Sequence, residues 1–281
     1  MPARVAEAAI PTWFSASVTH PGGRRLHLEI VKPEILSNYL ARIGYTGALV
    51  PSVDTLRRLH RAHLMTVPFE NLDIARKREI VCDEDKILEK IVGQKRGGFC
   101  YEMNGAFAAL LRGLGFEVTL LSARVPRADG SNGPEFDHLT LRVDLEQPWL
   151  ADVGFGDSFL DPLRLEMGAE QAQDARNFRI VEEDGLLHVE RMEPGAQWKR
   201  EYSFSLVARR LEDFSVMCRY HQTSPESPFT RKSVCTRATV GGRITLADRK
   251  LIVTRAGQRS ERVLEEEECG RVLREEFGVV L

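Results

Sequence analysis

Apolar residues recur with two different spacings along this chain. Between residues 33 and 115 they return every three or four positions, which is typical of helices buried along one face. This spacing predicts helices over residues 33–43, 52–65, 85–92 and 101–114. After Gly115 the spacing shortens to two positions, as in strands. It predicts strands at 116–120, 138–144, 149–155, 178–181, 186–191, 202–208, 234–239 and 243–246, before a last helix over about 261–277.

The order of these elements indicates the fold class. Helices come first, strands follow, and the chain ends in a small mixed segment, so we expect an α+β fold. Residues 1–33 are interrupted by prolines and glycines and contain one strand-like run at 26–30. We interpret them as an N-terminal extension.

The composition is that of an ordinary soluble globular protein. Of 281 residues, 43% are apolar and 28% are charged, and the formal charge is only −2, so no net field favours nucleic acid or an anionic membrane. No apolar run approaches the roughly 20 residues of a membrane span, and the N-terminus lacks the pattern of a secretory signal. We therefore expect a cytoplasmic protein without nucleic-acid or membrane partners.

Cysteine usage gives the first hint of chemistry. The five cysteines, at positions 82, 100, 218, 235 and 269, are far apart and never in CxxC spacing. This pattern argues against a disulfide framework and against a structural zinc site. It predicts free thiols in a reducing compartment, and the question is which of these thiols is chemically reactive.

Cys100 follows Gly97 and Gly98 at the start of the helix predicted over 101–114. Unpaired backbone N–H groups and the positive end of the helix dipole lie at such a position, and both favour a thiolate. They also supply donors for an oxyanion formed on an attacked carbonyl. By residue type alone, however, an inert buried cysteine is the favoured interpretation.

A histidine and an aspartate change that balance. In the strand predicted over 138–144, His138 alternates with apolar residues, which predicts that it projects from the polar face. Asp152 interrupts an otherwise apolar run over 149–155, and a buried carboxylate is costly unless a charged or hydrogen-bonding group meets it. One candidate partner is the imidazole of the preceding strand. The other singled-out histidines, at positions 60, 63 and 221, are interpreted as structural.

These three residues form a candidate Cys-His-Asp triad. His138 would take the Cys100 proton and leave a thiolate–imidazolium pair, while Asp152 would fix the ring tautomer and stabilise the cation. Such a triad needs no metal.

At these residues the sequence resembles the arylamine N-acetyltransferase family. The RGGxCxE-like cysteine motif of the family appears here as RGGFCYE at 96–102. The histidine strand appears as HLTLRV at 138–143, and the aspartate segment as DVGFG at 152–156. The likeness extends from about residue 34 to the C-terminus and includes YLARIGYTG (39–47), LHRAHLMTVPFENLDI (59–74) and YHQTSPESPFT (220–230).

The resemblance implies three domains after the extension. A helical domain over 34–115 would carry the nucleophile, a β-barrel-like domain over 116–225 would carry the histidine and the aspartate, and residues 226–281 would form a small α/β lid. The cysteine-protease-like Cys-His-Asp core would lie where the first two domains meet.

The resemblance also implies an activity. An acetyl group would pass from acetyl-coenzyme A, by ping-pong transfer through acetyl-Cys100, to a small-molecule arylamine, arylhydrazine or N-hydroxyarylamine. Whether the enzyme is a monomer or a homodimer stays open. The substrate side is expected to include Phe69, Val125, Phe155 and Phe229. The coenzyme A side is expected to include Gly98, Thr223, Ser224, Ser227 and Thr230.

Three other interpretations are open at this point. A macrolactam-forming amide synthase would use the same scaffold and triad on a carrier-bound acyl chain. A cysteine hydrolase or transglutaminase-like enzyme would release acetate without an amine acceptor. A non-catalytic binding module would have Cys100 react with iodoacetamide no faster than the other cysteines do.

Overall fold

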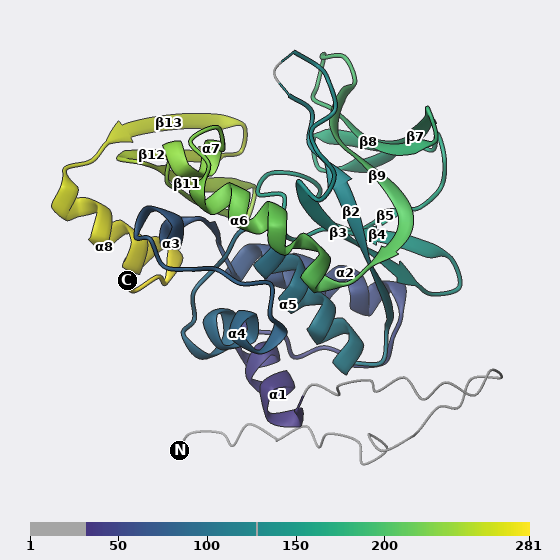
Figure 1. Cartoon of the computed structure of the whole chain (residues 1–281), viewed down its shortest axis with the longest axis horizontal. Helices are drawn as coiled ribbons and strands as arrows, with labels where there is room; N and C mark the ends of the chain where they lie inside the picture. The colour runs from purple at the N-terminus through teal and green to yellow at the C-terminus, as the bar shows by residue number, and fades with distance from the viewer. Residues whose placement is uncertain (1–31, 128) are drawn as a thin grey trace. The chain divides into compact units, whose positions relative to one another are not determined.

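The computed structural model describes residues 32–127 and 129–281 (Figure 1). The extension predicted over 1–33 therefore lies almost wholly outside the described residues. Within the described ranges, no helix has the length and apolar character needed to cross a membrane. Nor does that part of the chain hold a group of three or more His, Cys, Asp or Glu side chains arranged for a metal ion.

Helices occupy the first part of the described chain, which confirms the prediction from the longer spacing. Ser52 caps its helix by accepting a 3.1 Å hydrogen bond from the Thr55 N–H. The helix that begins at Cys100 is buried at every residue except Arg112, so helices and strands pack against it from several sides. The elements are α1 (Pro33–Arg42), α2 (Val53–Thr66), α3 (Leu72–Ala75), α4 (Glu84–Leu88) with a π-helical continuation (Glu89–Gly93), and α5 (Cys100–Gly113).

Eight antiparallel strands form the larger sheet, which is barrel-like and nearly closed. Their spatial order is β5-β4-β3-β2-β9-β8-β7-β6. A register shift between Leu121 and Ala123 bends the central pair β2 and β9. The strands are β2 (Glu117–Arg124), β3 (His138–Asp144), β4 (Pro148–Ala151), β5 (Leu163–Arg164), β6 (Gln171–Gln173), β7 (Arg176–Glu183), β8 (Leu186–Met192) and β9 (Lys199–Arg209).

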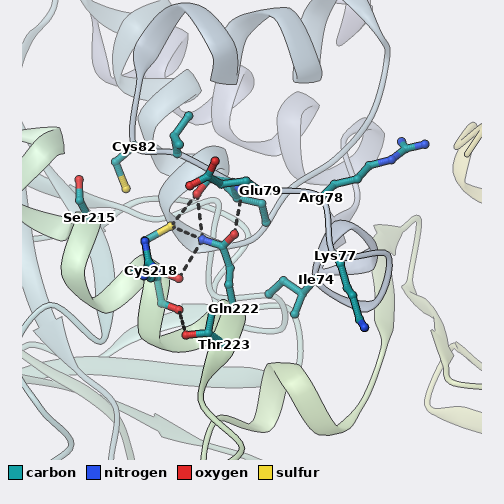
Figure 2. Close-up of a pocket in the computed structure, with 12 residues that line it drawn as sticks. Ile74, Lys77, Arg78, Glu79, Cys82, Ser215, Cys218, Gln222 and Thr223 are labelled. Carbon is teal, nitrogen blue, oxygen red and sulfur yellow. Dashed lines mark hydrogen bonds between the residues drawn. The ribbon is translucent and has the colours of Figure 1, made fainter.

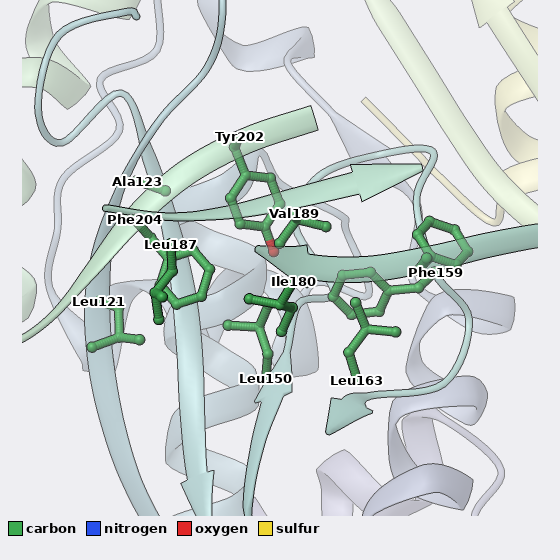
Figure 3. Packing of buried hydrophobic residues seen from close by; sticks show 11 residues of the cluster. Leu121, Ala123, Leu150, Phe159, Leu163, Ile180, Leu187, Val189, Tyr202 and Phe204 are labelled. Atoms are coloured by element: carbon green, nitrogen blue, oxygen red, sulfur yellow. The ribbon is translucent and has the colours of Figure 1, made fainter. Parts of the chain in front are cut away.

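An apolar cluster holds this sheet together (Figure 3). Leu121, Ile180, Val189 and Tyr202, from four different strands, belong to one cluster with Phe159 from the loop after β4, and each is at most 1% exposed. Phe155 packs against the same cluster while remaining partly exposed. A residue predicted to face the substrate is therefore backed by the hydrophobic core, which stabilises its position.

The smaller sheet has five antiparallel strands in the order β1-β10-β11-β12-β13 and is followed by a C-terminal helix. The prediction that this last helix begins near residue 261 is wrong, because residues 258–263 form an edge strand. Every residue of that strand is exposed, so no apolar alternation marks it. The elements are β1 (Phe69–Glu70), β10 (Val234–Thr239), β11 (Gly242–Ala247), β12 (Lys250–Arg255), β13 (Gln258–Val263) and α8 (Glu266–Phe277).

Two further differences from the predicted elements lie close to the candidate residues. The strand predicted over 149–155 ends at Ala151, and the following residues form a loop. Between β9 and β10 the chain forms α6 (Ser215–Thr223) and α7 (Pro228–Arg231), where the sequence pattern predicts no helix. These helices are short and lie in a segment rich in Ser, Thr and Pro, which favours turns.

A cluster of charges joins the two sheets beside this loop. Asp157 lies 3.0 Å from Arg176 of β7 and 3.2 Å from Arg243 of β11. Burial on its own would raise the pKa of Asp157, but the charges of Arg243 and Arg176 hold it below its usual range. The loop that carries Phe155 is therefore anchored to both sheets.

Candidate active site

Cys100 is the first residue of α5 and is 3% exposed. The two glycines before it are required by close packing: a Cβ at Gly97 would lie 1.9 Å from the Pro68 carbonyl oxygen, and one at Gly98 would lie 2.6 Å from the Glu102 side chain. Glu102 caps the helix by accepting a 3.1 Å hydrogen bond from the Phe99 N–H. The sequence before Cys100 therefore fixes where this thiol lies.

A buried network of ion pairs lies beneath this helix start. Arg96 contacts Glu70 at 2.7 Å and Asp73 at 3.0 Å, and Lys90 contacts Asp73 at 2.8 Å and Glu102 at 2.7 Å. Burial raises the pKa of Glu102 to about 7, although the charge of Lys90 acts to lower it. The network ties β1, α3, the π-helical turn and α5 into one unit around the thiol.

His138 and Asp152 meet as the sequence predicts. His138 Nε2 lies 2.6 Å from Asp152 Oδ2, and both side chains are buried. The other carboxylate oxygen, Oδ1, accepts hydrogen bonds of 2.9 Å from Asn104 Nδ2 and from the Gly154 N–H. Burial would raise the pKa of Asp152, but the charge and hydrogen bond of His138 outweigh it and keep this pKa below the ordinary value.

The expectation that His138 projects from a polar face needs correction. The first residues of β3 are buried on both faces, and His138 itself is 3% exposed. Its ring lies edge-on to Phe155, with centroids 5.3 Å apart, and 5.2 Å from the Tyr202 ring. These aromatic side chains come from segments far apart in the sequence, so strand alternation alone does not reveal them.

Asn104 is a positioning residue that the sequence analysis missed. It lies four residues after Cys100 on α5, and besides Asp152 its Nδ2 donates to the Leu139 carbonyl at 2.6 Å. Its Oδ1 accepts a 2.9 Å bond from the Val153 N–H. A polar asparagine directly before the apolar run GAFAALL of a buried helix is the signal that could have identified it.

Replacing Asn104 by Ala leaves several buried groups without partners. We expect Asn104→Ala to lower the free energy of unfolding by about 2–3 kcal/mol, the cost of unsatisfied buried polar groups. Denaturant unfolding measures this loss. The conservative variant Asn104→Asp keeps an oxygen for Val153 but places a second carboxylate beside Asp152. It should be no more stable than Asn104→Ala. A stable, fully active Asn104→Ala variant would contradict the assigned role.

His60 supports the same loop from its other side. Its Nε2 accepts a 3.1 Å hydrogen bond from the Asp152 N–H, and its Nδ1 lies 2.8 Å from the Leu160 carbonyl oxygen. Because a carbonyl only accepts, the ring carries its proton on Nδ1. Burial lowers the pKa of His60, which suits a neutral ring. His60, which the sequence analysis interprets as structural, thus supports the loop through hydrogen bonds at both Asp152 and Leu160.

Cys100 and His138 line one cavity of about 830 Å³. The four residues predicted on the substrate side all border it: Phe69, Val125, Phe155 and Phe229. The other lining residues include exposed Arg127 and Arg231 and buried His221. Asp152 lies behind His138 and not in the wall.

The residues predicted on the coenzyme side are not brought to this wall. The Ser227 hydroxyl accepts from the Phe229 N–H at 3.2 Å, that of Ser224 accepts from the Glu226 N–H at 3.2 Å, and that of Thr230 donates to the Ser224 carbonyl at 2.7 Å. Thr223 donates to the Arg219 carbonyl, and Gly98 bonds through its carbonyl to Glu70. Their role in cofactor binding stays a prediction.

The position of Cys100 at the start of a helix does not by itself lower the pKa of its thiol. Burial raises the pKa of Cys100 well above its usual value, and the charges of Asp137 and Asp152 act in the same direction. Backbone hydrogen bonds from Leu139 and Tyr101 oppose this only partly. Ionisation of this thiol therefore requires a base to take its proton. His138 uses Nε2 for Asp152, which leaves Nδ1 for that task.

A second cavity, of about 670 Å³, borders α6 and contains two further cysteines (Figure 2). Its Cys218 thiol accepts a 3.2 Å hydrogen bond from Gln222 and contacts the Ile80 carbonyl at 3.7 Å. Interaction with the Cys82 thiol, followed by burial, raises the pKa of Cys218. None of the described residues that line this cavity is a histidine, whereas His138 lines the cavity that contains Cys100.

Comparison with known proteins identifies relatives of this chain. A family model described as N-acetyltransferase matches residues 52–281. The arylamine N-acetyltransferase of Escherichia coli K12 is 37% identical over 219 residues, which cover 76% of this chain and 77% of that protein.

Two solved structures extend the comparison. The Mycobacterium marinum arylamine N-acetyltransferase in complex with CoA superposes with a TM-score of 0.81 at 32% identity, covering 87% of this chain and 92% of that one. A Bacillus cereus enzyme described with a Cys-His-Glu catalytic triad gives a TM-score of 0.81 at 25% identity, covering 88% and 99%. The chain belongs to the arylamine N-acetyltransferase family.

Proposed function

We propose that this protein transfers an acetyl group from acetyl-coenzyme A to an arylamine, arylhydrazine or N-hydroxyarylamine through acetyl-Cys100. The observation that carries the proposal is the cavity itself. A buried thiol and a histidine that is paired at 2.6 Å with a buried aspartate face the same aromatic-walled space. This is the arrangement that nucleophilic acyl transfer requires.

In the first half-reaction His138 Nδ1 takes the Cys100 proton, and the thiolate attacks the thioester carbonyl of acetyl-coenzyme A. The carbon–sulfur bond of the donor breaks, the imidazolium returns its proton to the departing coenzyme A thiolate, and acetyl-Cys100 remains. Asp152 holds the ring with Nε2 protonated and stabilises the imidazolium. Backbone N–H groups at the start of α5 can donate hydrogen bonds to the oxyanion.

In the second half-reaction the neutral amine attacks acetyl-Cys100. His138 takes the amine proton, the Cys100 thiolate leaves, and the amide product is released. An aromatic amine is largely unprotonated near neutral pH, so it needs orientation more than activation. The rings of Phe69, Phe155 and Phe229 border the cavity and can stack on it.

Coenzyme A is the acyl donor in this proposal, and the exposed edge of the cavity suits its phosphates. Arg127 and Arg231 lie there with exposed side chains. Guanidinium groups bind phosphate through paired N–H donors. We infer that the phosphates lie against this edge while the thioester extends inward to Cys100.

Intact-mass spectrometry tests the proposed function. Mixing the protein with acetyl-coenzyme A should add one acetyl group, and adding an aniline should remove it and yield an acetanilide. Acetate released without amine would favour a hydrolase, and acylation only from a carrier-bound chain would favour an amide synthase. No adduct at all would contradict an acyl-enzyme.

A further inference from the structure

A second histidine borders the same cavity and has an unused ring nitrogen. His221 on α6 is 3% exposed. Its Nε2 lies 3.1 Å from Asp137 Oδ1, within ion-pair distance, yet it is not aligned for a hydrogen bond with any of the described residues. A buried polar atom in that state normally has a partner such as water or a ligand group.

The tautomer of this ring follows from its other contact. His221 Nδ1 lies 3.1 Å from the Ser227 hydroxyl, which already accepts from the Phe229 N–H. The hydroxyl proton is therefore available for donation to Nδ1, and a neutral ring then carries its proton on Nε2. His221 thus presents a donor toward the cavity beside Asp137.

Asp137 presents unused acceptor capacity at the same place. Its side chain is 16% exposed and lies within ion-pair distance of His221, and among the described residues it accepts only one long hydrogen bond, 3.4 Å, from the Val125 N–H. A carboxylate can accept about four hydrogen bonds. Its charge also reaches the nucleophile, because it contributes to the raised pKa of Cys100.

The backbone before Asp137 is held in a strained conformation. Phe136 has a φ of 66°, in the left-handed region that a bulky residue rarely adopts. Ser122 Oγ accepts from its N–H at 2.8 Å, and the Tyr101 hydroxyl donates to its carbonyl at 2.7 Å. Strain that is stabilised in this way is found mainly at functional sites.

The remaining charged groups of this cavity lie toward solvent. Arg127, Arg231 and Glu226 are exposed, whereas Asp137 and His221 lie inside. An acceptor whose ring binds between Phe69, Phe155 and Phe229 would therefore place a second polar substituent beside Asp137 and His221.

We propose that Asp137 and His221 form a polar subsite that selects acceptors whose ring bears a hydrogen-bond donor, such as a hydroxyl group. The hydroxyl donates to the Asp137 carboxylate and accepts from His221 Nε2. An ether or alkyl group at the same ring position offers no donor, and a carboxylate is repelled. This inference rests on the proposed function, because it concerns the second half-reaction.

Competition between matched acceptors tests the subsite. The 2-, 3- and 4-aminophenols are each paired with their methyl ethers, which have similar electronic character but lack the donor. Because both acceptors of a pair meet the same acetyl-enzyme, the ratio of their kcat/KM values reports only the second half-reaction. For at least one isomer we expect the wild type to prefer the phenol, and Asp137→Ala to reduce that preference about tenfold, the loss of one hydrogen bond to a charged group.

Other variants separate selection from structural support. His221→Leu should also reduce the preference, and Asp137→Asn, which retains an oxygen acceptor, should reduce it less than Asp137→Ala. Glu226→Ala, which removes the exposed carboxylate of the same cavity, should leave the ratio unchanged. Equal losses of kcat/KM for phenol and ether would show a purely structural role and overturn the inference, as would a wild type without preference for any isomer. Failure of the wild type to acetylate either acceptor would instead contradict the proposed function.

Discussion

Cys100→Ala should abolish acetylation of the protein by acetyl-coenzyme A and lower amine acetylation by about 10⁴-fold or more, as expected when the group that forms the covalent intermediate is lost. The substitution removes one sulfur atom from a cavity wall, and the neighbouring Glu102 cap and the Arg96–Glu70 ion pair do not involve it. The fold should therefore persist. Intact-mass spectrometry and steady-state rates measure the two effects.

A matched variant tests whether the loss of acetylation is specific to the Cys100 thiol. Cys218 is also buried and has a raised pKa, but its neighbours are Cys82, Gln222 and the Ile80 carbonyl. Cys218→Ala should accept one acetyl group as the wild type does. Acetylated Cys100→Ala protein would show that another residue is the nucleophile.

Asp152→Asn should lower kcat/KM by about 10⁴-fold, the loss seen when the orienting aspartate of such a triad is replaced by asparagine. The geometry explains why an isosteric change is so harmful. Asn104 Nδ2 and the Gly154 N–H both donate to Oδ1, so the single oxygen of an asparagine will occupy that position. The new NH₂ group then faces His138 Nε2, which must accept. The ring proton moves to Nδ1, and the nitrogen needed to take the thiol proton is blocked.

Alkylation kinetics separate this tautomer effect from loss of structure. In the Asp152→Asn variant, Cys100 should react with iodoacetamide at pH 7 as slowly as a buried neutral thiol, because burial already raises its pKa. The circular dichroism spectrum should be unchanged. Near-normal turnover would remove Asp152 from the proposed triad.

The sequence predicts the regular helices for a simple physical reason, whereas the candidate residues of the cavity wall have another origin. Helices such as α2 bury one continuous face, so the apolar period and the Ser52 cap reveal them. Phe69, Val125, Phe155 and Phe229 come from the family resemblance, and all four border the cavity.

The parts that sequence reasoning missed depend on contacts between distant segments. Asn104 is recognisable as a positioning residue only when the loop at Asp152 packs beside it. His221 and Asp137 are 84 residues apart, and no local period links α6 to the start of β3. The exposed strand β13 buries no face, so its residues give no alternation to detect.

One helix turn separates Cys100 from Asn104 on α5, and this spacing has a mechanical consequence. The nucleophile and the clamp on the aspartate loop belong to the same rigid body, and a Cβ at Gly154 of that loop would lie only 2.9 Å from the Cys100 Cα. A thermal displacement of α5 therefore carries the thiol and the aspartate loop along together. The distance between the thiol and the aspartate loop should therefore change little when α5 moves relative to the smaller sheet.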